Sequence, residues 1–286
     1  MTKTLEQSIA AGRRLWIDFD AYVAKLFDAP VPWLNQVDFA AYYGKAQGLL
    51  RSDVIALSAE SVAAALLASD AELQQALAAK SRNVYPLRRL LEEPRLRTAI
   101  ASLLIVLRAA HGERPLALTI PSPRRWLALA YQAAHGLALD TEIAGDADEI
   151  DGASVYVADF LRSFATSQID ILLLCESPGQ APADEEQLAC YQSVVNIARH
   201  YRWQLGLLDQ AALVAPFRGD SLDFCIAPSL AASALGGVIP EAEFWQGSPA
   251  PGLANGQFHY LNVPALLQPE FVLERLVALR ASAAAK

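Results

Sequence analysis

The sequence contains little of what several large protein classes require. Its three cysteines, Cys175, Cys190 and Cys225, lie far apart and form no CxxC pair. Such a sparse, odd set is typical of a reducing compartment rather than of a disulfide-stabilised secreted domain. No run approaches the roughly 18–20 apolar residues of a membrane span, and the first residues lack the apolar core of a signal peptide. We therefore expect a soluble, cytoplasmic protein without a membrane partner.

Positive charge and nucleotide-binding motifs are also missing. The net charge is −8, whereas a nucleic-acid-binding surface needs a basic stripe. We therefore expect no nucleic-acid partner. No GxGxxG follows the first strand pattern, and neither GxxxxGKS nor GxxxxGKT occurs in the chain. Their absence removes the main sequence support for a Rossmann or P-loop protein.

What the sequence does contain is a regular alternation of short apolar segments and helical patterns. The patterns predict strands at residues 53–58, 116–120, 169–175, 204–208, 222–227, 236–239 and 258–263, with a weaker eighth at 15–19. Helical patterns include 123–135, 153–166, 184–201 and a last helix that begins at Pro269, while the acidic stretch 145–152 reads as a loop. Such alternation indicates right-handed βαβ units. We predict a single (β/α)8 TIM barrel over residues 51–286, preceded by a helical extension over residues 1–50.

Three segments carry a resemblance to a known superfamily. They are LALTIPSPRRW at 116–126, IDILLLCE at 169–176 and FHYLNVPALLQPEFVLERLVALR at 258–280. From residue 53 onward, about four-fifths of the chain, the order of features resembles the superfamily of uroporphyrinogen decarboxylase and cobalamin-independent methionine synthase. The resemblance implies a TIM barrel whose site lies at the carboxyl ends of its strands. It also implies either zinc-dependent methyl transfer or metal-free decarboxylation.

The zinc-dependent branch of that superfamily carries an HxC on a late strand and a cysteine on the last strand, where zinc holds a thiolate. Here the four histidines are followed two positions later by Glu113, Leu137, Arg202 and Leu261, and the last strand ends at Asn262 and Val263 without a cysteine. We therefore expect no metal and no cofactor. The decarboxylase branch holds substrate carboxylates with arginines instead, so the resemblance favours a lyase or a metal-free group transfer.

Five polar residues at strand ends are candidates for substrate binding. Ser58 and Glu60 follow the strand at 53–58 and either face the site or cap and charge the next helix. Arg124 and Arg125 are either solvated first-turn residues or ligands of an anion, since cations oppose the dipole at a helix N-terminus. Asn262 ends the last strand. We predict that these residues bind a small anionic substrate that bears a carboxylate.

Three further residues are candidates for catalysis. Glu176 emerges from an apolar strand, where partial burial suits general acid-base chemistry; the alternative is a carboxylate paired with a neighbouring arginine. Asp209 serves either as a second carboxylate or as a loop cap. Cys175 is either a nucleophile or, more commonly for a free cysteine, a small buried hydrophobe. His259 begins the last strand and thus lies at the end opposite to the predicted site.

Two functions fit these observations. The first is an enzyme in which arginines anchor an anionic substrate and carboxyl groups transfer protons. The second is a catalytically inactive barrel that acts as a binding or partner subunit, motivated by the missing zinc motif. An open pocket lined by arginine and glutamate would favour the enzyme, and a mouth filled by bulky side chains would favour the subunit. The acidic, apolar-rich chain and this barrel class also favour a homodimer.

Overall fold

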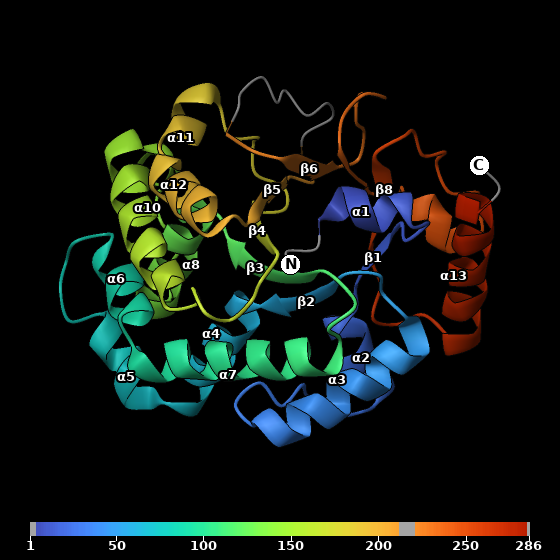
Figure 1. The fold of residues 1–286 in the computed structure, drawn as a ribbon. Coiled ribbons are helices and arrows are strands. Elements are labelled where there is room, and N and C mark those ends of the chain that lie inside the picture. The colour runs from blue at the N-terminus through green and yellow to red at the C-terminus, as the bar shows by residue number, and fades with distance from the viewer. Residues whose placement is uncertain (1–3, 212–220, 285–286) are drawn as a thin grey trace.

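Eight parallel strands form one barrel-shaped sheet in the computed structural model, which describes residues 4–211 and 221–284 (Figure 1). The strands in the described ranges are β1 (Leu15–Asp18), β2 (Ile55–Ser58), β3 (Leu116–Pro121), β4 (Ile171–Cys175), β5 (Gln204–Leu208), β6 (Phe224–Ala227), β7 (Gly236–Val238) and β8 (Gln257–Asn262). Their order in the sheet is β1-β8-β7-β6-β5-β4-β3-β2, and every neighbouring pair is parallel. The predicted (β/α)8 TIM-barrel fold is confirmed, and each strand overlaps a predicted segment.

The helices surround this sheet and connect its strands. They are α1 (Leu5–Ala10), α2 (Asp20–Leu26), α3 (Gln36–Leu50), α4 (Ala59–Ser69), α5 (Ala71–Leu77), α6 (Tyr85–Leu91), α7 (Pro94–Ala110), α8 (Pro123–His135), α9 (Thr141–Gly145), α10 (Ala147–Arg162), α11 (Glu185–Ala189), α12 (Gln192–Tyr201), the 3-10 helix η1 (Ala242–Gln246) and α13 (Pro269–Ala284). Figure 1 shows the longer helices outside the ring of strands. Among the described helices, none has both the length and the apolar character that crossing a membrane requires.

Two helices differ from the predicted ranges. The stretch predicted as an acidic loop at 145–152 contains the start of α10, where Asp146 caps the helix and Asp148 and Glu149 lie in its first turn. Acidic residues favour a helix N-terminus, so the charge that suggested a loop instead marks a helix start. The single helix predicted at 184–201 is divided into α11 and α12, with Cys190 and Tyr191 between them.

The barrel begins well before residue 51. β1 pairs with β8 in the sheet, so residues 1–50 contribute a strand and are not only a helical extension. The helix before it, α1, buries Leu5 and Ile9 against side chains from inside the barrel, including Trp16. The Leu5 N–H also donates to Oε1 of Gln204, at the first residue of β5, over 2.7 Å. These contacts place α1 at the N-terminal end of the barrel, which leaves the carboxyl end for a site.

Aromatic side chains fill the interior of the barrel. The Trp16 ring lies 6.1 Å from that of Phe258 and 5.8 Å from that of Tyr260, measured between ring centroids. Gly206 provides the space for Phe224, because a Cβ on Gly206 would lie 2.2 Å from the Phe224 ring. This aromatic layer forms the floor on which the carboxyl-end cavity rests, since Trp16 and Tyr260 also line that cavity.

A few hydrogen bonds from the segment before β2, rather than a strand ladder, join the two ends of the sheet. β1 and β2 are the terminal strands of the sheet order. The Asp53 N–H donates to the Leu15 carbonyl over 2.7 Å, and Asp53 Oδ2 accepts from the Leu15 N–H over 3.0 Å. Ser52 Oγ accepts from the Ile17 N–H over 3.0 Å. This seam closes the barrel at its N-terminal side, and the cavity lies above it.

Candidate active site

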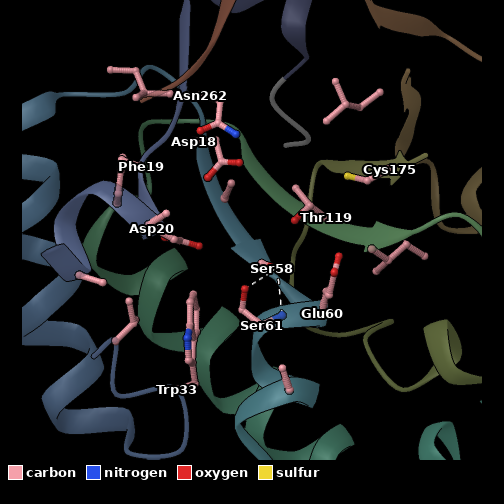
Figure 2. A pocket seen from close by; sticks show the side chains of 18 of the residues that line it. Asp18, Phe19, Asp20, Trp33, Ser58, Glu60, Ser61, Thr119, Cys175 and Asn262 are labelled. Carbon is pink, nitrogen blue, oxygen red and sulfur yellow. Dashed lines mark hydrogen bonds between the residues drawn. The ribbon is translucent and has the colours of Figure 1, made fainter. Parts of the chain in front are cut away.

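A cavity of about 680 Å³ lies at the carboxyl ends of the strands, where TIM-barrel sites are found (Figure 2). Pockets for small organic ligands commonly have this size. Six of the eight site residues predicted from the sequence line it: Ser58, Glu60, Arg125, Cys175, Glu176 and Asn262. Arg124 and Asp209 are not among its described lining residues.

Glu176 is held on every side by other protein groups. Its Oε2 accepts from Arg124 Nε over 2.7 Å and from Ser122 Oγ over 2.8 Å, and its Oε1 accepts from the Tyr191 hydroxyl over 2.6 Å. Its side chain is 1 % exposed. The arginine pair, the alternative to an acid-base role, is what the structure shows. A carboxylate with both oxygens occupied has little freedom to exchange a proton with a substrate.

Arg124 is directed at the protein rather than at a ligand. Besides Glu176, it donates through Nη1 to Gln187 Oε1 over 3.2 Å and through Nη2 to the Ala181 carbonyl over 2.9 Å. These bonds tie α8 to the segment between β4 and α11, in which Pro178 lines the cavity. Arg124 therefore positions the rim of the cavity, and the predicted contact with substrate is not what its geometry supports.

Arg125 and Glu60 form a second ion pair at the cavity wall. Arg125 Nη2 lies 2.8 Å from each carboxylate oxygen of Glu60. The pair joins the first turn of α8 to that of α4. Each charge that the sequence offers to a substrate is thus balanced by a neighbouring residue of opposite charge.

Ser58 both caps α4 and lines the cavity. Its Oγ accepts from the Ser61 N–H over 3.1 Å and from the Ser61 hydroxyl over 3.0 Å (Figure 2). Ser58 therefore has both positions expected from the sequence, the helix cap and the wall of the cavity. Asp209 accepts from the Ala211 N–H over 2.9 Å, the geometry of a loop cap. Asn262 is the register partner of Asp18, which brings its amide to the mouth of the barrel.

Cys175 lines the cavity as a thiol. Burial raises its pKa to about 12, and the negative charges of Glu60 and Asp18 add to this effect against the opposing influence of Arg125. A nucleophilic cysteine needs a lowered pKa, because the thiolate is the reactive form. Cys175 thus has the character of a small apolar residue.

Two carboxyl groups that the sequence-based prediction missed lie in the same cavity. Asp18 is the last residue of β1 and Asp20 the first of α2, and Figure 2 shows both side chains at the cavity wall. The Asp18 carboxyl accepts hydrogen bonds from the Asp20 N–H and the Tyr260 hydroxyl. Asp20 accepts no hydrogen bond from the described side chains or backbone around it. It is the polar group of the cavity with the most freedom to meet a ligand.

The surroundings of both groups disfavour charge. Burial raises the pKa of Asp18, although its two hydrogen bonds oppose this. Burial, and next the charge of Asp18, raises the pKa of Asp20 from 3.8 to about 8. The Tyr43 hydroxyl accepts from the Ala56 N–H over 3.2 Å, and burial raises its pKa as well. At neutral pH the Asp20 carboxyl therefore carries a proton.

A signal for these residues exists in the sequence. The segment Trp16-Ile17-Asp18-Phe19-Asp20 belongs to the weakest predicted strand, at 15–19. TIM-barrel sites lie at the carboxyl ends of the strands, and this rule selected the other candidate residues. Applied to the strand at 15–19 as well, it also selects Asp18 and Asp20.

Comparisons with known proteins add no relative. No family model, no curated protein and no solved structure matches the chain. Within residues 4–211 and 221–284, no three or more His, Cys, Asp or Glu side chains are grouped so that they could hold a metal ion.

Proposed function

We propose that this protein is an enzyme that transfers protons to and from a small organic substrate, with Asp18 and Asp20 as its acid-base pair. The observation that carries the proposal is the meeting of two adjacent carboxyl groups in one open cavity at the carboxyl end of a TIM barrel. Lyase reactions, including decarboxylation and elimination, and isomerisations need such proton transfers.

The two carboxyl groups suit different roles. Burial raises the pKa of Asp18, while its hydrogen bonds from Tyr260 and from the Asp20 backbone oppose this shift and fix the position of the carboxyl group. Asp20 holds a proton at neutral pH because its pKa is about 8. Two neighbouring carboxyls that share one proton offer a base and an acid at the same place. We assign the base to Asp18 and the acid to Asp20.

The open cavity favours an enzyme over an inactive subunit. The alternative of a partner subunit predicts a barrel mouth filled by bulky side chains. The mouth instead contains a cavity of about 680 Å³ with polar groups converging on it. Arg125 and Glu60, the arginine and glutamate that favoured the enzyme, are both in its wall.

The test is a screen for turnover in D2O. The purified protein is incubated with a metabolite extract, and mass spectrometry follows consumption of compounds and uptake of deuterium. We expect conversion of at least one compound, and Asp18→Asn and Asp20→Asn should each lower its rate by about 10²- to 10⁴-fold, the usual contribution of a general acid or base. Asp148→Asn, a change at an exposed first-turn residue of α10, is the matched control and should retain the rate. Full activity in both site variants would refute the assignment.

Three expectations from the sequence stay predictions. They are the relationship to the uroporphyrinogen decarboxylase and methionine synthase superfamily, the cytoplasmic location and the homodimer. Light scattering of the purified protein tests the last of these.

A further inference from the structure

The charges of the cavity do not balance. Its described lining holds four acidic side chains and one basic side chain, namely Asp18, Asp20, Glu60, Glu176 and Arg125. Glu60 is paired with Arg125, and Glu176 with Arg124 from outside the lining. The Asp18–Asp20 pair is left without a cation among the described lining residues. Ionisation of either carboxyl group adds a negative charge to the cavity.

No described group of the protein compensates that charge directly. Asp18 is hydrogen-bonded by neutral donors, and the nearby Glu60 adds negative charge. Asp20 is affected by burial and by the charge of Asp18, and no described hydrogen-bond donor reaches its carboxyl. A carboxyl group removed from water without a partner is costly unless it is protonated or meets a cation. A ligand that brings positive charge would therefore stabilise the ionised forms of Asp18 and Asp20.

The wall beside the pair is aromatic. Phe19 lies between the two aspartates in the chain, and Trp33 and Tyr43 line the same cavity (Figure 2). The Phe19 and Tyr43 rings pack together with their centroids 5.4 Å apart. Faces of aromatic rings attract cations and give nothing comparable to anions. Aromatic residues next to carboxyl groups suit a ligand that combines a positive charge with an apolar part.

We infer that the substrate carries a protonated amine, which the Asp18–Asp20 pair binds next to the aromatic wall. The inference rests on the proposed function, since it names the substrate class of the same site. An ammonium group complements two carboxyl groups that no basic side chain of the described cavity lining pairs. This cationic substrate takes the place of the anionic substrate expected from the sequence. Arg124 and Arg125, which were expected to bind an anion, each bind a glutamate of the protein instead.

Three probes of one shape and different charge test this inference. Benzylamine, benzyl alcohol and benzoate are titrated into the full-length protein by calorimetry at pH 8. We expect the protonated amine to bind at least about 10-fold more tightly than the alcohol, which corresponds to about 1.4 kcal/mol. Benzoate should bind most weakly. Asp18→Asn and Asp20→Asn should remove the preference for the amine, and Asp148→Asn should preserve it.

The outcomes separate this inference from the proposed function. Tightest binding of benzoate, equal binding of amine and alcohol, or no binding of any probe would overturn the amine inference. So would a preference for the amine that both site variants keep. None of these results bears on the acid-base roles, which fail only when the site variants retain turnover in the D2O screen.

Discussion

Replacing Asp20 with asparagine should stabilise the protein at alkaline pH. The pKa of Asp20 is about 8 in the folded chain, against its ordinary value of 3.8, which applies in the unfolded chain. A raised folded pKa means that the folded state binds the proton more tightly. The stability that this proton provides is complete below the unfolded pKa and is lost as the pH rises toward 8. Asparagine resembles the protonated acid in shape and cannot ionise, so the variant escapes this loss.

The magnitude follows from the same pKa difference. Between pH 5 and pH 8, each pH unit costs the wild type at most about 1.4 kcal/mol, which sets a ceiling of about 4 kcal/mol. Because Asp20 lines an open cavity, water screens part of this cost, and we expect about 2 kcal/mol. The stability advantage of the variant over the wild type should therefore be larger at pH 8 than at pH 5 by about this amount.

Urea unfolding followed by tryptophan fluorescence measures this effect at both pH values. Asp18→Asn is an informative companion, since removal of the Asp18 charge lowers the pKa of Asp20 and should move the loss of stability to lower pH. Asp148→Asn controls for the removal of an exposed carboxylate. A difference between wild type and Asp20→Asn that does not change with pH would refute the reasoning, and so would a less stable variant at pH 8.

Three further changes test the scaffold around the cavity. Glu176→Gln should lower the free energy of unfolding by about 3 kcal/mol, because Arg124 keeps its buried charge without a counter-ion. An unchanged urea midpoint would show that the Arg124–Glu176 ion pair does not stabilise the fold. Gly206→Ala should cost about 1–3 kcal/mol, because the new Cβ lies 2.2 Å from the Phe224 ring. Phe224→Leu in the same chain should recover part of this loss, and a double variant less stable than Gly206→Ala would contradict the packing argument. Iodoacetamide should modify Cys175, whose pKa is about 12, at least about 100-fold more slowly in the folded chain than in urea; peptide mass spectrometry measures both rates, and equal rates would contradict the buried thiol.

The strands were predictable because each one leaves a local pattern. Short apolar segments bounded by polar residues mark β4 and β5 directly, and even the short β1 shows as the segment 15–19. The end of the barrel that holds the site was predictable for the same reason, since it follows from strand direction alone. The acidic start of α10 shows the limit of this approach, because a loop and a helix N-terminus share the same residue types.

The partners of the site residues were not predictable from local patterns. Arg124 and Glu176 are 52 residues apart, and only the packing of α8 against the end of β4 decides that they meet each other. The same holds for Arg125 and Glu60, which are 65 residues apart. In the structure each of the two arginines is paired with a glutamate of the protein. Sequence spacing predicts which strand end a residue occupies, but not which charge remains unpaired there.

The pairing of the first strand with the last has a consequence for how this protein matures. β1, which carries Asp18, finds its ladder partner only in β8, whose Asn262 lies opposite Asp18. During synthesis β1 leaves the ribosome early and waits for almost the whole chain before that ladder can form, and long-range pairing of this kind is slow. Until then the edge of β1 is open to other strands, a recognised route to aggregation. The proposed acid-base pair is therefore among the last parts of the molecule to be assembled, and a chain stopped before β8 should accumulate without the complete cavity.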